Sequence, residues 1–127
     1  MVVDADVILR YLTNDDPQKA DRFESFVTSG KKASLTDVTF SEIYWTLRSF
    51  YKFPKTKIIH ALECLIEIRS IVCDLELLQS TLVILRKHNV SLIDAYNAAY
   101  SILRDDRRVL SFDRDFDRLP GIKRLEP

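Results

Sequence analysis

The sequence predicts one α/β domain with a mostly parallel central sheet of four to five short strands and helices on both faces. Short apolar segments alternate with longer amphipathic segments along the chain. Parallel neighbouring strands need crossover connections, which are usually helices, so this alternation favours a parallel sheet. The chain of 127 residues also has only two glycines and four prolines, fewer than the tight turns of an all-β fold would require.

Five short apolar segments account for the predicted strands. They cover residues 1–3, 33–35, 70–73 and 109–112, with 122–125 as a possible last strand. Residues 114–118 form a polar turn before that last segment.

Helical spacing of apolar residues predicts two helices in each of the three intervals between the first four segments. The first helix begins around Asp4 to Asp6, and the second begins at Asp16-Pro17 and stops at Gly30. The later helices cover approximately residues 38–50, 55–68, 75–87 and 91–103, the last opened by a serine cap.

Composition narrows the class of protein. No repeat or linker divides residues 1–127, so a single domain is expected. Nineteen basic and nineteen acidic side chains cancel, which gives no overall electrostatic signal for nucleic acid or membrane.

Cys64 and Cys73 lack metal-ligand spacing and are expected to be reduced, buried side chains. No secretion signal or membrane-spanning stretch is evident, so we expect a cytoplasmic protein.

Four acidic residues stand out in this outline, and three of them occupy positions where a parallel sheet gathers ligands. Asp4 and Asp113 follow predicted strands, Glu42 lies early in the helix after the second strand, and Asp94 lies in the first turn of a later helix. Carboxylates held close together repel one another unless a cation neutralises them, and an all-oxygen site favours Mg²⁺ or Mn²⁺. This combination predicts metal-assisted phosphodiester hydrolysis.

Each of these acids also has a purely structural interpretation. Ser91 to Asp94 and Thr39 to Glu42 both match capping boxes, in which the acid binds a free backbone N–H at its own helix start. Asp113 could be a helix N-cap and Asp4 a turn residue. Capping and metal binding are compatible, so both interpretations stay open.

Four segments together resemble the PIN-domain ribonucleases, and among them the VapC toxins of toxin–antitoxin pairs. The segments are VVDADVILRYLTNDDP, TFSEIYW, SLIDAYNAA and VLSFDRDFDRLPGI, in this order. The resemblance implies a Rossmann-like sheet and an endoribonuclease that cleaves single-stranded RNA, in which Asp4, Glu42, Asp94 and Asp113 bind Mg²⁺ or Mn²⁺. It also implies that the Ser111 hydroxyl holds the acids or a metal-bound water in place.

The chain departs from the family pattern at two places. Asp6 stands where the family usually has asparagine, and it either adjusts the metal affinity or caps the following helix. Asp115 and Asp117 lie close to Asp113, and the resemblance favours Asp113 as the ligand with Asp115 in support.

A neutral protein that binds RNA must gather its cations locally. The basic candidates for this contact are Arg10, Lys52, Lys55 and Arg114, although any one of them can equally be an ordinary surface charge. The resemblance further implies single-stranded or structured RNA as substrate, a homodimer, and a cognate antitoxin protein across the active site.

Two rival functions remain. Asp4 and Asp6 after an apolar strand also resemble the nucleophile motif of haloacid-dehalogenase-like phosphatases, in which Asp4 would attack phosphate. That function leaves Glu42 and Asp94 without a role. The other rival is a PIN-fold interaction module that does not cleave RNA.

Overall fold

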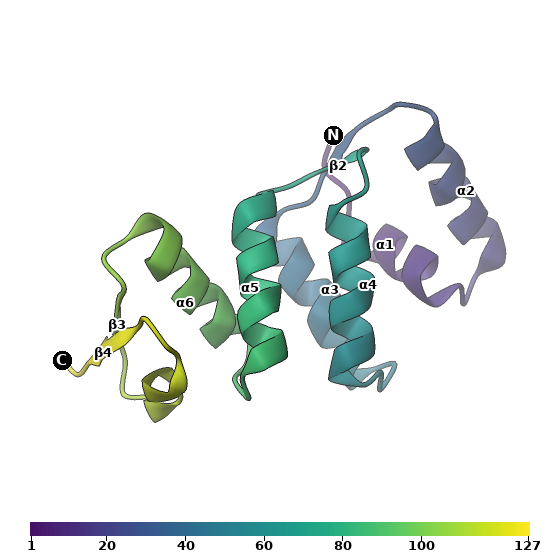
Figure 1. Ribbon diagram of the computed structural model, residues 1–127. Helices are drawn as coiled ribbons and strands as arrows, with labels where there is room; N and C mark the ends of the chain where they lie inside the picture. Colours follow the sequence, from purple (N-terminus) through teal and green to yellow (C-terminus); the bar gives the residue numbers. More distant parts are fainter. The chain divides into compact units, whose positions relative to one another are not determined.

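The computed structural model describes residues 1–127 and consists of two compact units (Figure 1). The first unit is Met1–Leu75 and the second is Glu76–Pro127. None of the helices combines the length and apolar character that crossing a lipid bilayer requires.

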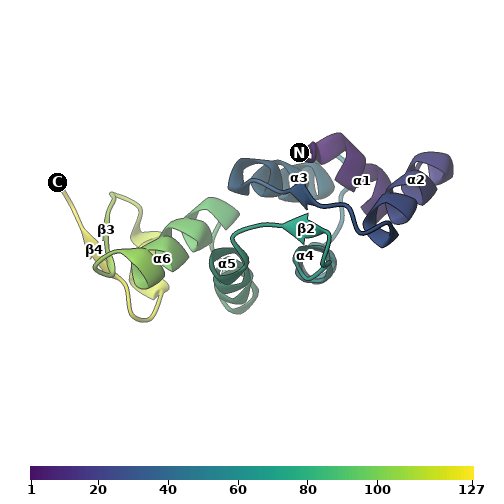
Figure 2. The same ribbon diagram turned by 90° about the horizontal axis from the view of Figure 1, so that it is seen from above.

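The first unit contains four helices and one small parallel sheet. Its helices are α1 (Ala5–Thr13), α2 (Pro17–Thr28), α3 (Asp37–Ser49) and α4 (Lys55–Ile66). Its strands β1 (Ala33–Ser34) and β2 (Ile71–Val72) pair in parallel, and Val2 makes a single parallel bridge to Ser34. Helix α1 packs against both α2 and α3 (Figure 2).

A side-chain cap and a left-handed glycine mark the two ends of α2. The Asp16 carboxylate accepts a hydrogen bond from the Lys19 backbone N–H at 3.2 Å, with Pro17 as the first helical residue of α2. Gly30 has a φ of +83°, a conformation that few other residues adopt, so the chain turns there toward β1.

Apolar side chains from all four helices form the core of the first unit, with Ala20 and Phe23 as the buried residues of α2. Members of this core that are at most 1% exposed include Ile8, Phe40, Ile43, Leu47, Ile58, Ile59 and Leu62. Their helical spacing is the amphipathic pattern seen in the sequence, so burial of these faces explains why the four helices form.

The second unit contains two helices, a short 3₁₀ helix and a second parallel sheet. Helix α5 (Leu75–Lys87) starts at the boundary between the units and is followed by α6 (Leu92–Arg104). Strands β3 (Arg108–Leu110) and β4 (Lys123–Leu125) pair in parallel across the 3₁₀ helix η1 (Arg114–Arg118). Helix α6 contacts both β3 and η1, which brings the start of α6 and the β3–η1 turn into one region.

The expected central sheet of four to five strands is wrong. The structure has two sheets of two strands each, although both are parallel as predicted. The strands are only two or three residues long. Two backbone hydrogen bonds join residues 1–3 to Ser34, enough for a bridge but not for a ladder. Apolar character locates such segments correctly, but it does not specify how many neighbours each one pairs with.

Two smaller predictions also need correction. Thr39 does not open α3, because that helix already begins at Asp37 and is capped by the Thr36 side chain. Cys64 is exposed rather than buried, because it lies on a solvent-facing position of α4, and Cys73 is only partly buried. Both thiols are free, as expected.

Candidate metal centre

Three aspartates of the second unit bring their carboxylates together. One oxygen from each of Asp94, Asp113 and Asp115 lies within 4.8 Å of the others. Asp94 and Asp115 are half-buried, and Asp113 is exposed. Carboxylate oxygens are the preferred ligands of hard divalent cations, so the donor set fits Mg²⁺ or Mn²⁺.

The start of helix α6 positions Asp94. The Ser91 hydroxyl caps this helix by accepting a hydrogen bond from the Asp94 backbone N–H at 3.1 Å. The next residue, Ala95, is completely buried. Asp94 therefore lies at the edge of the apolar face of α6, where its carboxylate is partly shielded from water.

The turn after β3 positions Asp113 and Asp115. The Asp113 backbone N–H donates to the Ser111 hydroxyl at 2.9 Å, and the Asp115 backbone N–H donates to Asp113 Oδ1 at 2.8 Å. Asp113 is thus the N-cap of η1, and Phe116 anchors that short helix by being almost fully buried. Capping occupies only one carboxylate oxygen of Asp113, so this aspartate can serve as both cap and ligand.

An arginine holds one side of the cluster. Arg118 Nη2 lies 2.8 Å from Asp115 Oδ1 and also donates to the Asn89 carbonyl oxygen at 2.8 Å. Asp117, in contrast, forms an ion pair with Arg124 at 3.0 Å and is not a member of the cluster. The structure therefore places the carboxylate of Asp115, and not that of Asp117, beside Asp113.

The electrostatics of the cluster are unfavourable for three negative charges. The pKa of Asp94 is raised above its ordinary value, first by burial and then by the charges of Asp113 and Asp115. The hydrogen bond with Ser91 opposes this increase of the Asp94 pKa. A bound divalent cation would offset both the free-energy cost of burying the Asp94 charge and the repulsion between the three carboxylates.

The other two predicted acids, Asp4 and Glu42, belong to the first unit. Asp4 occupies the N-cap position of α1, but its side chain makes no capping hydrogen bond. Glu42 is exposed in the interior of α3, so the predicted capping role for it is wrong. Both carboxylates are unpaired and free to bind a ligand. Their participation in a site with Asp94 and Asp113 stays a prediction.

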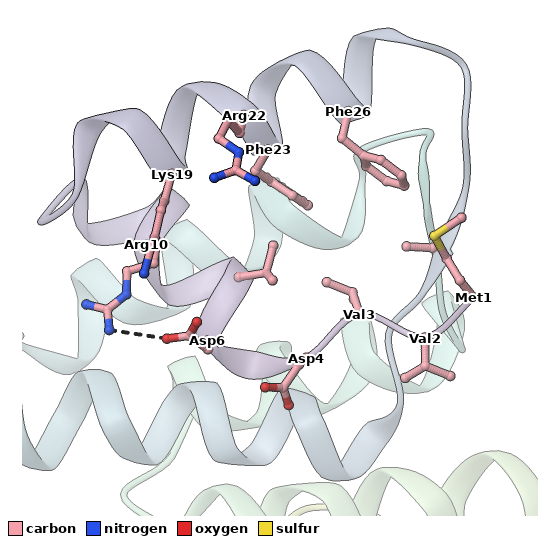
Figure 3. A pocket seen from close by; sticks show the side chains of 12 residues that line it. Met1, Val2, Val3, Asp4, Asp6, Arg10, Lys19, Arg22, Phe23 and Phe26 are labelled. Atoms are coloured by element: carbon pink, nitrogen blue, oxygen red, sulfur yellow. Dashed lines mark ion pairs between the residues drawn. The ribbon is translucent and has the colours of Figure 1, made fainter.

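Asp6 is occupied by an ion pair within the first unit. Its carboxylate lies 3.2 Å from Arg10 Nη2, one helical turn further along α1 (Figure 3). Arg10 also binds Asp15 at 2.7 Å, and the Tyr51 hydroxyl donates to the same carboxylate at 2.7 Å. This chain of contacts ties α1 to the segment after α3 and gives Asp6 a local structural partner.

The predicted RNA-contacting cations differ in how available they are. Arg10 is held by two carboxylates. Lys52 is exposed in the loop after α3, and Arg114 is exposed and unpaired at the start of η1. Burial, and to a lesser degree the charge of Arg48, lowers the pKa of Lys55.

Two arginines near the cluster have structural roles that the sequence analysis did not predict. Arg118 binds Asp115, a role that the sequence does not indicate by residue type alone. Arg124 joins β4 to the segment after β3 through Asp117 and the Ser111 carbonyl oxygen, and it also pairs with the neighbouring Glu126. The alternation of acidic and basic residues in 113–118 is the signal for such local pairing.

Comparison with known families assigns most of the chain. The family model described as PIN domain matches residues 1–122. Neither the curated proteins nor the solved structures include a significant match to this sequence. The matched range covers the first unit and residues 76–122 of the second, and it contains Asp4, Glu42, Asp94, Asp113 and Asp115. The chain therefore belongs to the PIN domain family.

Proposed function

We infer that this protein is a metal-dependent endoribonuclease that cleaves single-stranded RNA. PIN domains are typically metal-dependent nucleases. The observation that carries the inference is the convergence of Asp94, Asp113 and Asp115 within 4.8 Å. Without a cation this arrangement costs free energy through repulsion, which makes a role in cation binding its simplest explanation.

The residues of the cluster have distinct tasks in the proposed site. Asp94 and Asp113 supply oxygen ligands, and Ser111 fixes the turn that presents Asp113. Asp115 supports them while Arg118 balances its charge. A divalent cation held there would polarise a phosphate oxygen and lower the pKa of a bound water.

Asp4 and Glu42 complete the proposed acidic quartet. Two facts support this part of the proposal: both carboxylates are exposed and unpaired, and the family match contains them together with Asp94 and Asp113. A phosphate chain is held by cations, and Lys52 and Arg114 are the unpaired candidates for that contact.

The biological setting is proposed on the resemblance to VapC proteins. In that setting the protein is a cytoplasmic toxin, forms a homodimer and is inhibited by a cognate antitoxin. Size-exclusion chromatography with light scattering tests the homodimer. Co-expression with the product of a small neighbouring reading frame tests the antitoxin, because a cognate partner should co-purify and suppress cleavage.

Cleavage of a labelled pool of single-stranded RNA tests the proposed activity. The purified protein is incubated with Mg²⁺, Mn²⁺ or EDTA, beside Asp94→Asn and the matched control Asp16→Asn. Asp16 is a helix cap outside the acidic cluster, so its variant controls for capping and for contaminating nucleases. We expect cleavage by the wild type and Asp16→Asn with metal, and none with EDTA or Asp94→Asn. Equal activity of Asp94→Asn and wild type would refute the proposal.

Glu42→Gln separates the nuclease from the rival phosphatase. A PIN nuclease that uses Glu42 should lose most of its RNA cleavage, whereas a phosphatase with Asp4 as nucleophile should keep its turnover of a phosphomonoester. The pairing of Asp6 with Arg10 already disfavours the phosphatase, because Asp6 would have to act there as the acid and base. An interaction module without catalysis would require no metal for its binding.

A further inference from the structure

A pocket in the first unit has a mixed apolar and cationic wall. Its volume is about 580 Å³, within the range of small-ligand sites. The pocket lies between α2, the first turns of α1 and residues 1–3 (Figure 3). No function derived above uses it, apart from Asp4 on its wall.

The apolar part of the pocket is aromatic on the side of α2. Figure 3 shows the rings of Phe23 and Phe26 pointing from α2 toward the N-terminal segment. The two rings stack on one another at 6.1 Å between centroids. Phe23 is buried, whereas Phe26 is partly exposed and can present a ring face to a ligand. Met1 and Val2 at the edge of the pocket are exposed apolar side chains that a ligand could cover.

The cationic part of the pocket is only partly neutralised. Arg10 and Asp6 balance one another through their ion pair. Arg22 lines the pocket without any ion pair or hydrogen bond, and Lys19 contacts Asp16 only at 3.9 Å. Both cations reach from α2 on the same side as the aromatic rings (Figure 3). The pocket therefore offers a flat apolar face beside two cations that are available for an anion.

We propose that this pocket binds one nucleotide of single-stranded RNA, with its base on Phe26 and a phosphate on Arg22 and Lys19. An aromatic base with an adjoining phosphate matches the two kinds of wall, since bases stack on aromatic rings and phosphates bind arginine and lysine. Asp4 lines the same pocket, so an RNA strand with one nucleotide bound there passes close to one of the proposed catalytic acids. The proposal deepens the proposed nuclease function and rests on it.

Binding measured without cleavage tests this proposal. A short labelled single-stranded RNA is titrated in EDTA with Asp94→Asn as the background protein, and anisotropy is followed over a range of salt concentrations. Arg22→Gln should weaken binding and make the dependence of log K on log salt shallower by about 0.7, the effect of one lost phosphate contact. Arg69→Gln is the matched control, because Arg69 is an exposed arginine outside the pocket. It should bind as the background protein does.

Substitution of Phe26 tests the stacking part of the proposal. Phe26→Ala should weaken binding by roughly five-fold or more, the lower end of what one base stacked on a ring contributes. Phe26→Leu, which keeps an apolar side chain, should weaken binding similarly while it preserves the thermal midpoint. Phe50→Ala is the control, because Phe50 is an exposed ring outside the pocket.

The outcomes separate this proposal from the nuclease function. If RNA binds but the Arg22 and Phe26 variants match their controls, the pocket proposal is overturned and the nuclease function stands. In that case a segment of a partner protein becomes the better candidate for the pocket. If the wild type neither binds nor cleaves RNA, both proposals fail.

Discussion

Replacement of Asp113 by asparagine removes one negative charge from the cluster without removing the helix cap. Asparagine is about as good an N-cap as aspartate, so the hydrogen bond from the Asp115 backbone N–H should persist. The Asp113 charge faces two others, Asp94 and Asp115, each with an oxygen within 4.8 Å. In water, two unit charges at that distance repel by about 0.9 kcal/mol.

The substitution should therefore stabilise the metal-free protein. Two repulsive pairs amount to about 2 kcal/mol without salt, and physiological ionic strength reduces this to roughly 1 kcal/mol. For a chain of this length, such a gain raises the thermal midpoint by about 3–5 °C. With divalent cation bound, the wild type should instead be the more stable of the two proteins. The wild type gains about 1.4 kcal/mol at a metal concentration ten times its dissociation constant, and the variant gains less.

Thermal unfolding followed by circular dichroism measures both effects. The wild type, Asp113→Asn and the capping control Asp16→Asn are compared in EDTA, at low and high salt, and with Mn²⁺. Asp16→Asn should show neither the gain in EDTA nor the loss of the metal response. A variant that is no more stable than wild type in EDTA, and that responds to Mn²⁺ equally, would refute the view that Asp113 belongs to a cation site.

Three further predictions concern the neighbours of Asp113. Arg118→Gln removes a cation that binds Asp115, so Mn²⁺ should bind up to about five-fold more tightly by calorimetry, the range of one exposed ion pair; weaker binding would contradict this. Ser91→Ala removes the cap of α6 and should lower the free energy of unfolding by about 1 kcal/mol in urea titrations. The pKa of Asp94 is raised in the folded state. In EDTA, Asp94 therefore makes its full contribution to the unfolding free energy below its ordinary pKa of 3.8, and this contribution is lost as the pH rises through the raised pKa. Urea titrations over that pH range should show this decline in the wild type and not in Asp94→Asn.

Local sequence signals predicted most of the helices. Asp16-Pro17 and Ser91 mark the starts of α2 and α6 through caps that the structure contains. Helix α5 begins and ends where the periodicity places it. These signals are reliable because capping and amphipathic spacing act over one or two turns of the chain.

The sheet was harder to predict because strand pairing depends on distant residues. Apolar runs mark β1 and β3 within one or two residues, yet nothing in a run states which strand pairs with which. The same limit affects the site. Asp113 and Asp115 are neighbours in sequence, and their proximity to Asp94 comes from the packing of α6 against η1. The pairing of Arg118 with Asp115 depends on side-chain geometry that residue type alone does not specify.

Direct titration of Mn²⁺ by calorimetry tests the central claim, that Asp94 belongs to a site for the divalent cation of a nuclease. The wild type, Asp94→Asn and Asp16→Asn are titrated at neutral pH, and each is then assayed for RNA cleavage over the same metal concentrations. The account predicts saturable binding and parallel cleavage for the wild type and Asp16→Asn, with both lost in Asp94→Asn. Metal binding and cleavage that survive in folded Asp94→Asn would contradict it.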